Sequence, residues 1–429
     1  SGIGHNAWLV GGCVRDLLME KRPWDWDICT DAMPDIILTL FEKTVPTGLK
    51  HGTVSVVLPD GLYEVTTLRV EDAYLDSRRP SQVHFTTDLT EDLSRRDFTM
   101  NSIAVDRYGR IHDPFSGAAD ISAGLIRAVG DASLRFQEDG LRMLRALRFQ
   151  AQLGFQLDPV LMEGIKENGD RIRRISAERI RVELDKLLCS DAPEVIYSLE
   201  DFGLLSILLP EILPSLLCYQ NNTYHEQTVS LHTSRAMKSC ENSSLLRWTV
   251  FLHDIGKPFM LEIGADGRTH FYRHEKRSAE LAQDVLKRLR FPNEFIQTAC
   301  ILIEHHGLLI EPNERSVRRA IHKLSEPLFP LFLEVQQADI MGQAEIYQKE
   351  RLQRLEQAQS LYTEILEKDH CLSVKDLAIN GKDLIQLGVA RGKEIGHILE
   401  ALLDLVLENP EMNDRQVLIH HVQAHLRKK

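Results

Sequence analysis

The chain has 429 residues, of which 43% are hydrophobic and 27% charged, and its net charge is −12. These proportions are typical of a globular protein, and the length suffices for about two to four domains. No run of 18 apolar residues occurs, which excludes a membrane-spanning helix, and the first residues lack the basic and apolar regions of a signal peptide.

Seven scattered cysteines without a C-x-x-C pair predict free thiols and a cytoplasmic location rather than disulfides or a zinc site. The acidic total is unusual for a nucleic-acid-binding protein, but phosphate contacts require only local cations. Two arginine clusters provide them and predict one RNA-binding face: Arg142, Arg145 and Arg148, then Arg171, Arg173, Arg174, Arg179 and Arg181.

Residues 8–30, WLVGGCVRDLLMEKRPWDWDICT, predict a strand, a Gly-Gly turn, a short helix, a basic turn and a second strand. Because alternate residues of a strand share a face, Asp25 and Asp27 should present two carboxylates about 6–7 Å apart. Such a pair, with substrate phosphates, favours Mg²⁺. Gly11 and Gly12 would let the backbone approach a phosphate. An Asp-x-Asp pair on an exposed strand can also lack a function.

The strings GGCVRD and DWDICT resemble the signature of class II nucleotidyltransferases of the polymerase-β superfamily. This group comprises the tRNA CCA-adding enzymes and the bacterial poly(A) polymerases. The resemblance implies that Asp25 and Asp27 are catalytic and hold Mg²⁺, and that Gly12 and Arg15 bind the nucleotide. Further matching motifs extend it over the first 185 residues.

Residues 53–58 (TVSVVL) and 63–70 (YEVTTLRV) flank a Pro-Asp-Gly turn and predict a hairpin. The preceding TGLKHGT resembles the form found in CCA-adding enzymes. The resemblance implies that Glu64 is a third metal-facing carboxylate, although a solvent-facing glutamate is an alternative. Residues 71–82, EDAYLDSRRPSQ, match the flexible loop of enzymes that add the terminal adenosine, which argues against a CC-only enzyme.

Residues 93–105, LSRRDFTMNSIAV, match the next motif of the family. By resemblance, Arg96 and Asp97 contact the triphosphate and sugar of the nucleotide. A guanidinium offers a planar donor fork to phosphate. The turn-rich residues 113–120 resemble a hinge, so we expect the catalytic head to end near residue 120.

Residues 135–149, RFQEDGLRMLRALRF, predict one amphipathic helix. By resemblance, Asp139 and Arg142 read the Watson–Crick edge of the incoming base, and Arg145 and Arg148 hold the triphosphate. A wrong base would leave a buried polar group unpaired, which costs about 1–3 kcal/mol. The same pattern also fits an ordinary charged helix with internal ion pairs.

Residues 171–188, RIRRISAERIRVELDKLL, match a later helical motif. Ser176 is the expected N-cap of its helix. We expect Glu178 and Arg179 to brace the structure and the other arginines to contact tRNA. A solvated charged face is the alternative.

The order H…HD…H…HH…D over residues 225–345 resembles the HD-domain phosphohydrolases. Imidazole and carboxylate ligands suit a divalent transition metal or Mg²⁺. The resemblance implies either phosphodiesterase and phosphatase activity or a retained fold that grips the tRNA. The implied ligands are His232, His253, Asp254, His274, His305, His306 and Asp339.

The sequence thus predicts an α/β polymerase-β-like head, followed by an all-α neck, an HD body and a helical tail. The expected function is template-independent addition of CCA to tRNA from CTP and ATP, with an HD phosphohydrolase activity. Alternatives are an A-adding enzyme with a CC-adding partner, a poly(A) polymerase, or an HD phosphohydrolase with a vestigial head. A homodimer is also left open. The predicted domains are residues 1–120, 121–215, 216–345 and 346–429.

Overall fold

The computed structural model describes residues 4–71, 83–222, 225–368 and 370–427. The chain forms two compact units, Ser1–Leu213 and Pro214–Lys429, and each is described by itself. The expected adenosine loop at 71–82 lies outside the described residues, apart from the backbone of its first residue.

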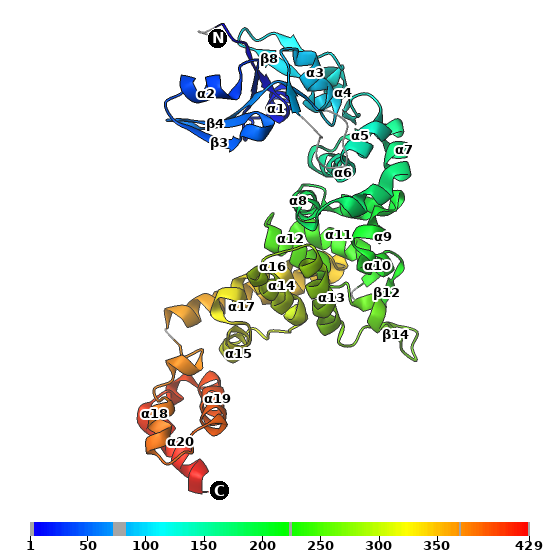
Figure 1. Cartoon of the computed structure of the whole chain (residues 1–429). Helices are drawn as coiled ribbons and strands as arrows, with labels where there is room; N and C mark the ends of the chain where they lie inside the picture. The colour runs from blue at the N-terminus through cyan, green and yellow to red at the C-terminus, as the bar shows by residue number, and fades with distance from the viewer. Residues whose placement is uncertain (1–3, 72–82, 223–224, 369, 428–429) are drawn as a thin grey trace. The chain divides into compact units, whose positions relative to one another are not determined.

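The first unit contains a seven-stranded mixed sheet with the order β3-β4-β5-β2-β1-β8-β9 (Figure 1). Its central pair β2 and β5 is parallel, and β4 and β5 form the predicted antiparallel hairpin, with Val54 opposite Val65. The sheet confirms the predicted α/β head. Its strands are β1 (Ala7–Val10), β2 (Asp27–Thr30), β3 (Thr44–Gly48), β4 (Thr53–Leu58), β5 (Gly61–Thr67), β8 (Ala104–Asp106) and β9 (Ile111–His112).

The two faces of this sheet have different surroundings. Ile28 belongs to a buried cluster with Ile37 of the helix that covers one face. Cys29, which points to the opposite face, packs with Leu93. Asp27 shares the face of Cys29 because the side chains of a strand alternate. Asp27 therefore lies on the face that this covering helix leaves open.

Helices and short strand pairs complete the first unit, whose part after residue 122 is helical as predicted, except for one short parallel strand pair. The two pairs outside the main sheet are β6 (Arg69–Glu71) with β7 (Val83–Phe85), and β10 (Leu125–Ile126) with β11 (Gln156–Leu157). The α-helices are α1 (Gly12–Leu18), α2 (Pro34–Leu40), α3 (Leu89–Ser94), α4 (Gly117–Ala123), α5 (Ala132–Glu138), α6 (Leu141–Leu153), α7 (Pro159–Asn168), α8 (Ala177–Leu188) and α9 (Leu204–Leu208). Short 3-10 helices are η1 (Leu49–His51), η2 (Thr99–Asn101), η3 (Gly169–Arg174), η4 (Pro193–Phe202) and η5 (Pro210–Ile212).

The single helix predicted over 135–149 is wrong in one respect, because two helices meet there. α5 ends at Glu138, and α6 begins at Leu141. Asp139 between them has extended backbone angles, and its Oδ1 accepts a hydrogen bond from the Leu141 amide at 3.1 Å. Aspartate competes for backbone amides, and the following Gly140 has a low helix propensity. Asp139 therefore stands at the entrance of α6 rather than on its face.

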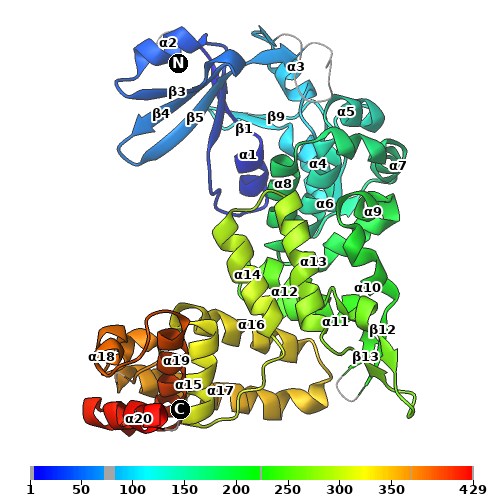
Figure 2. The same cartoon turned by 60° about the horizontal axis from the view of Figure 1, so that its bottom comes forward.

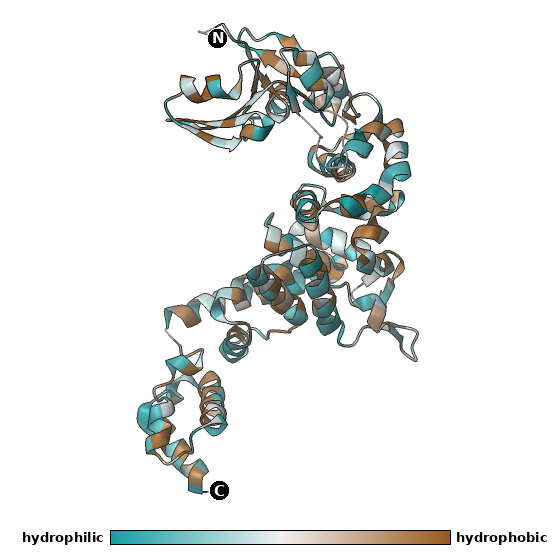
Figure 3. Cartoon of the chain, viewed as in Figure 1, coloured by the Kyte–Doolittle hydropathy of each residue, from teal (hydrophilic) through white to brown (hydrophobic). Residues whose placement is uncertain are grey.

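The second unit is mainly helical (Figure 2). Hydrophobic and hydrophilic residues are interspersed along its helices, as in amphipathic helices that bury one face (Figure 3). The α-helices are α10 (Leu213–Leu217), which begins at the boundary, α11 (Val229–Ser239), α12 (Ser244–Leu252), α13 (His274–Arg288), α14 (Asn293–His305), α15 (Glu314–Leu324), α16 (Phe329–Met341), α17 (Glu345–Glu367), α18 (Gly381–Gln386), α19 (Lys393–Glu408) and α20 (Arg415–Arg427).

The second half is mainly helical, as predicted, and two short antiparallel hairpins interrupt its helices. They pair β12 (Tyr219–Asn222) with β13 (His225–Thr228), and β14 (Glu262–Ile263) with β15 (Thr269–His270). The remaining 3-10 helices are η6 (Lys257–Met260), η7 (Glu326–Leu328), η8 (Val374–Asp376) and η9 (Pro410–Met412).

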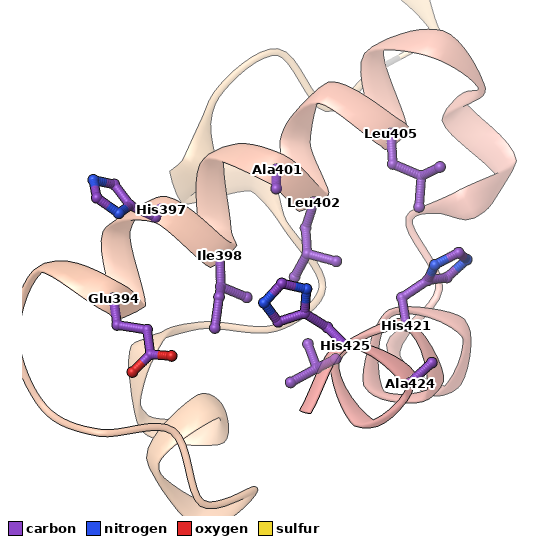
Figure 4. A pocket seen from close by; sticks show the side chains of 10 residues that line it. Glu394, His397, Ile398, Ala401, Leu402, Leu405, His421, Ala424 and His425 are labelled. Carbon is purple, nitrogen blue, oxygen red and sulfur yellow. The ribbon is translucent and has the colours of Figure 1, made fainter. Parts of the chain in front are cut away.

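Helices α19 and α20 line a groove of about 660 Å³ near the end of the chain (Figure 4). Ile398 and Leu402 contribute apolar side chains, and His397, His421 and His425 contribute imidazoles. Among the described residues, no helix is both long and apolar enough to span a bilayer.

Candidate active site

The Gly-Gly turn brings the first residues of α1 next to the Asp27 carboxylate. Gly11 has a φ of 80°, which glycine adopts without strain. A Cβ added there would lie 3.0 Å from Arg96 Nη1 and 3.5 Å from Asp27 Oδ2. The turn therefore requires glycine so that Arg96 and Asp27 can approach the backbone.

The two predicted aspartates line the same cleft, but only one belongs to the strand. β2 begins at Asp27, and Asp25 lies in the exposed bend before it. The sequence placed both on one strand because the period-2 pattern does not mark where pairing with β5 begins. Glu64 is the register partner of Asp27 on β5 and is exposed.

Electrostatics support a cation at these carboxylates. Burial raises the pKa of Asp27, and the negative charges of Asp25 and then Glu64 raise it further against the opposing Arg96. Crowded carboxylates repel each other unless a cation lies between them. The three acids offer oxygen donors of the kind that a divalent cation such as Mg²⁺ prefers.

The cleft beside these acids has a volume of about 710 Å³, a size suited to a small-molecule ligand. Seven arginines and one lysine face five aspartates along its wall, so the lining carries a net positive charge that suits a triphosphate. The lining residues used below are Gly12, Arg15, Trp24, Asp25, Asp27, Arg96, Asp97, Asn101, Asp139, Arg142, Arg145, Arg148, Phe149 and Arg179.

A chain of side-chain contacts connects α1 with α6 across the cleft. Arg15 donates a hydrogen bond to Asn101 Oδ1 at 2.9 Å, and Asn101 Nδ2 donates to Asp97 Oδ1 at 3.2 Å. Asp97 Oδ2 accepts from Arg145 Nε at 2.7 Å. Burial opposes ionisation of Asp97, but the contacts with Arg145 and Asn101 outweigh it and lower its pKa to about 2. Asp97 therefore orients arginine side chains within this network.

Three arginines gather around Phe149 of α6. The guanidinium carbons of Arg15, Arg145 and Arg148 lie 5.2, 5.6 and 4.1 Å from the centre of its ring. Cations over an aromatic face are attracted by the ring quadrupole. Phe149 thus holds three positive charges close together at the wall of the cleft.

Buried Glu183 of α8 compensates part of this charge. Its carboxylate oxygens lie 3.1 Å from Arg148 Nη1 and 3.8 Å from Arg145 Nη1. The expected brace Glu178 is exposed, so that prediction named the wrong glutamate of this helix. Ser176 is the N-cap position but makes no side-chain capping hydrogen bond.

The two residues expected to read the base are both engaged by neighbours. Asp139 forms a two-point ion pair with Arg179, whose Nη2 and Nη1 lie 2.6 and 3.3 Å from its oxygens. Arg142 is buried and donates to Glu138 Oε2 at 2.5 Å and to the Arg95 carbonyl at 2.8 Å. Both side chains are therefore held in defined orientations.

The structure places every predicted nucleotide-binding residue on the cleft lining, while Glu64 lies beside it. Sequence reasoning missed Asn101, Phe149 and Glu183. Asn101 falls within the RRDFTMN string, so the match to this motif could have identified it. Phe149 and Glu183 resemble ordinary core and surface residues of amphipathic helices, and only packing reveals their contacts.

A second cluster lies within the second unit. His232, His253, Asp254 and Asp339 bring four ligand atoms within 4.8 Å of one another, and Asp254 also forms such a group with His274 and His306. His253 and Asp254 follow the end of α12, where adjacent side chains can converge as expected. His305 belongs to neither group, and its Nδ1 lies 2.9 Å from the Ile301 carbonyl oxygen.

Close packing with neighbouring residues fixes the side chains of this second cluster. A Cβ on Gly342 would lie only 2.6 Å from His232 Nδ1, so the ring occupies the space that glycine leaves. Buried Lys257 lies 2.6 Å from Asp254 Oδ2 and donates to Gln220 Oε1 at 2.8 Å. Six of the seven predicted ligands are thus brought together.

Comparison with known families agrees with this organisation. The matching families are described as "Poly A polymerase head domain" at residues 7–127, "Probable RNA and SrmB- binding site of polymerase A" at 154–216 and "tRNA nucleotidyltransferase domain 2 putative" at 269–422. The fold and the cleft define a nucleotidyltransferase of the poly(A) polymerase type. None of the three descriptions names an HD domain, so that resemblance stays a prediction.

Individual relatives narrow this class to the CCA-adding enzymes. A CCA-adding enzyme of Bacillus velezensis is 34% identical over 406 residues, covering 94% of this chain and 90% of that protein. One from Leuconostoc citreum is 52% identical over 185 residues, covering 43% of this chain and 46% of that protein. The Bacillus stearothermophilus CCA-adding enzyme in complex with CTP matches with a TM-score of 0.75 and 28% identity, covering all of this chain and 95% of that one. The chain belongs to the CCA-adding enzyme family and is a tRNA nucleotidyltransferase.

Proposed function

We propose that this chain adds CCA to the 3′ end of tRNA, using CTP and ATP without a nucleic-acid template. The supporting observation is one cleft that holds Asp25 and Asp27 together with Asp139, Arg142 and the phosphate-facing arginines. Relatives that align along nearly the whole chain carry the name CCA-adding enzyme.

The side chains divide the work of binding between them. Arg15, Arg96, Arg145 and Arg148 bind the triphosphate, because guanidinium groups match phosphate geometry. Gly12 lets the backbone approach the same phosphates. These contacts orient the α-phosphate toward the tRNA 3′-hydroxyl, and positioning of this kind supplies much of the rate of phosphoryl transfer.

Base choice follows from hydrogen-bonding complementarity at the entrance of α6. Asp139 accepts from the exocyclic amino group that cytosine and adenine share, and Arg142 donates to their ring acceptors. Uracil and guanine present a carbonyl there and leave a polar group unpaired, at a cost of about 1–3 kcal/mol. The protein thereby replaces a template strand.

The carboxylates are proposed to hold two Mg²⁺ ions. Asp25 and Asp27 supply the hard oxygen ligands, with Glu64 beside them. When bound, Mg²⁺ lowers the pKa of the attacking hydroxyl and stabilises the leaving pyrophosphate.

An addition assay tests this proposal. Purified protein is given tRNA lacking CCA, or tRNA ending in CC, with CTP, ATP, UTP or GTP alone or in combination. The expected result is two C residues from CTP alone, then one A once ATP is added, and then arrest. Extension only of tRNA ending in CC would indicate an A-adding enzyme, and continued addition of A would indicate a poly(A) polymerase.

A second activity is proposed for the histidine cluster. Its two ligand groups, which share Asp254, support a divalent metal centre of the HD type with phosphodiesterase or phosphatase activity on 2′,3′-cyclic or terminal phosphates. Lys257, whose Nζ lies 2.6 Å from Asp254 Oδ2, would contact the phosphate of the substrate.

Metal analysis tests this second site with a matched control. His253→Ala should lose bound metal and hydrolysis of a 2′,3′-cyclic nucleotide while CCA addition continues. His305→Ala should retain both, because His305 lies outside the ligand groups. Equal metal content and equal hydrolysis in the wild type and His253→Ala would exclude this metal centre.

Three further features belong to the proposal. Exposed Arg173 and Arg174 contact tRNA. The free thiols of Cys13 and Cys29 fit a cytoplasmic location. Sedimentation analysis would test whether the chain forms a homodimer.

A further inference from the structure

Trp24 stands at the mouth of the catalytic cleft with 99% of its surface exposed. The other tryptophans, Trp8, Trp26 and Trp248, are half-buried or buried. Burial of a large aromatic side chain stabilises the folded protein. Full exposure of such a side chain at a binding cleft is therefore typical of a ligand contact.

The local chain keeps this ring in solvent. Pro23 is buried and anchors the turn, while Trp24 and Asp25 after it are exposed. Lys21 and Arg22, which precede Pro23 in the same turn, are also exposed, so two cations lie within three residues of the aromatic ring. Exposed cations beside an exposed aromatic are the combination that binds single-stranded RNA, through phosphates and base stacking respectively.

The position of Trp24 indicates which base it contacts. It directly precedes Asp25, at the site of bond formation, whereas the base of the incoming nucleotide is assigned to Asp139 and Arg142. The base on the other side of the reacting phosphate belongs to the RNA strand that carries the attacking hydroxyl. We propose that Trp24 stacks on the terminal base of the tRNA 3′ end, with Lys21 and Arg22 contacting its phosphates. This inference rests on the proposed CCA addition.

Steady-state kinetics distinguish stacking on the terminal tRNA base from stacking on the base of the incoming nucleotide. Trp24→Ala should raise the KM for tRNA lacking CCA about tenfold or more, since a stacked base is worth about 1–3 kcal/mol. The KM for CTP should stay within about twofold. Trp24→Phe should restore the KM for tRNA to within about threefold of the wild type. Trp24→Leu, which keeps apolar bulk without a π-face, should resemble Trp24→Ala.

Tyr108→Ala is the matched control. Tyr108 is 67% exposed and lies against Arg107 and Arg110, but it is outside the cleft lining. Its loss should leave the KM values for tRNA and CTP unchanged.

Fluorescence gives a readout that does not depend on catalysis. Adding tRNA lacking CCA, without nucleotides, should quench the fluorescence of the wild type more than that of Trp24→Phe. An unchanged KM for tRNA, a rise confined to the KM for CTP, rescue by Trp24→Leu or equal quenching in both proteins would each overturn the stacking proposal. Failure of the wild type to add C and A would instead overturn the proposed function.

Discussion

Arg179 forms a two-point ion pair with Asp139, 40 residues earlier in the chain, at 2.6 and 3.3 Å. This contact fixes the carboxylate proposed to read the amino group of the incoming base. We therefore expect Arg179 to act as a positioning residue for nucleotide selection.

Replacing Arg179 should reduce the specificity for CTP over UTP and GTP more than it reduces the rate of addition. With Arg179→Ala, Asp139 loses its orientation, and we expect incorporation of UTP and GTP relative to CTP to rise about tenfold, as for one lost polar contact. Arg179→Lys keeps the positive charge but loses the planar two-point donor geometry, so it should recover only part of the discrimination. Arg173→Ala replaces an exposed arginine of the preceding turn and should leave this discrimination unchanged. A uniform fall in kcat with unchanged ratios would contradict this role.

Glu183 should matter for stability as well as for the site. Its removal leaves Arg145 and Arg148 without this buried counter-charge, and burial already lowers the pKa of Arg148 to about 10. We expect Glu183→Ala to reduce the free energy of unfolding by about 3–5 kcal/mol, as for broken buried pairs. Glu178→Ala, on the exposed side of the same helix, should change it by less than about 0.5 kcal/mol. Urea denaturation of both variants measures the difference.

The buried ion pair of Asp97 should make stability depend on acid pH. Its pKa is about 2 in the folded chain and 3.8 in an unperturbed aspartate. Because the folded value is lower, the pair stabilises the fold fully above about pH 4, and this contribution is lost as pH falls toward about 2. The loss is roughly 2 kcal/mol. Thermal unfolding at pH 6 and pH 3 should therefore show a smaller pH effect in Asp97→Asn than in the wild type, and equal effects would contradict the assignment.

Gly342 should be needed for the histidine cluster. An added methyl group would lie 2.6 Å from His232 Nδ1 and 2.9 Å from the His232 carbonyl oxygen. Gly342→Ala should therefore displace the His232 ring and lower the metal content measured by mass spectrometry. Gly396→Ala, where an added Cβ meets nothing within 4 Å, should keep the metal. Full metal content in Gly342→Ala would argue against His232 as a ligand.

Much of the first unit could be predicted from local patterns. The strands around the Gly-Gly turn and the β4–β5 hairpin follow from alternation and turn residues, and the residues that line the cleft follow from motif strings. The break at Asp139 could not be predicted by periodicity, because the leucines and arginines keep helical spacing across it. Asp25 was likewise placed on a strand that begins only at Asp27.

Contacts between distant segments account for most of what the sequence did not reveal. Glu183 differs from Glu178 only in the side of α8 it occupies, and the packing of α8 on α6 decides which one is buried. His305 and His306 are adjacent in sequence, but their side chains diverge at the end of α14, so only His306 joins the cluster.

We propose above all that Asp27 holds the metal ions for nucleotidyl transfer in the cleft that Asp139 lines. Incorporation of labelled CTP into tRNA lacking CCA by Asp27→Ala, measured with the Kd for the same tRNA, tests it most directly. We predict no incorporation above the background without enzyme and a Kd within about twofold of the wild type. Retained turnover by Asp27→Ala would contradict the account.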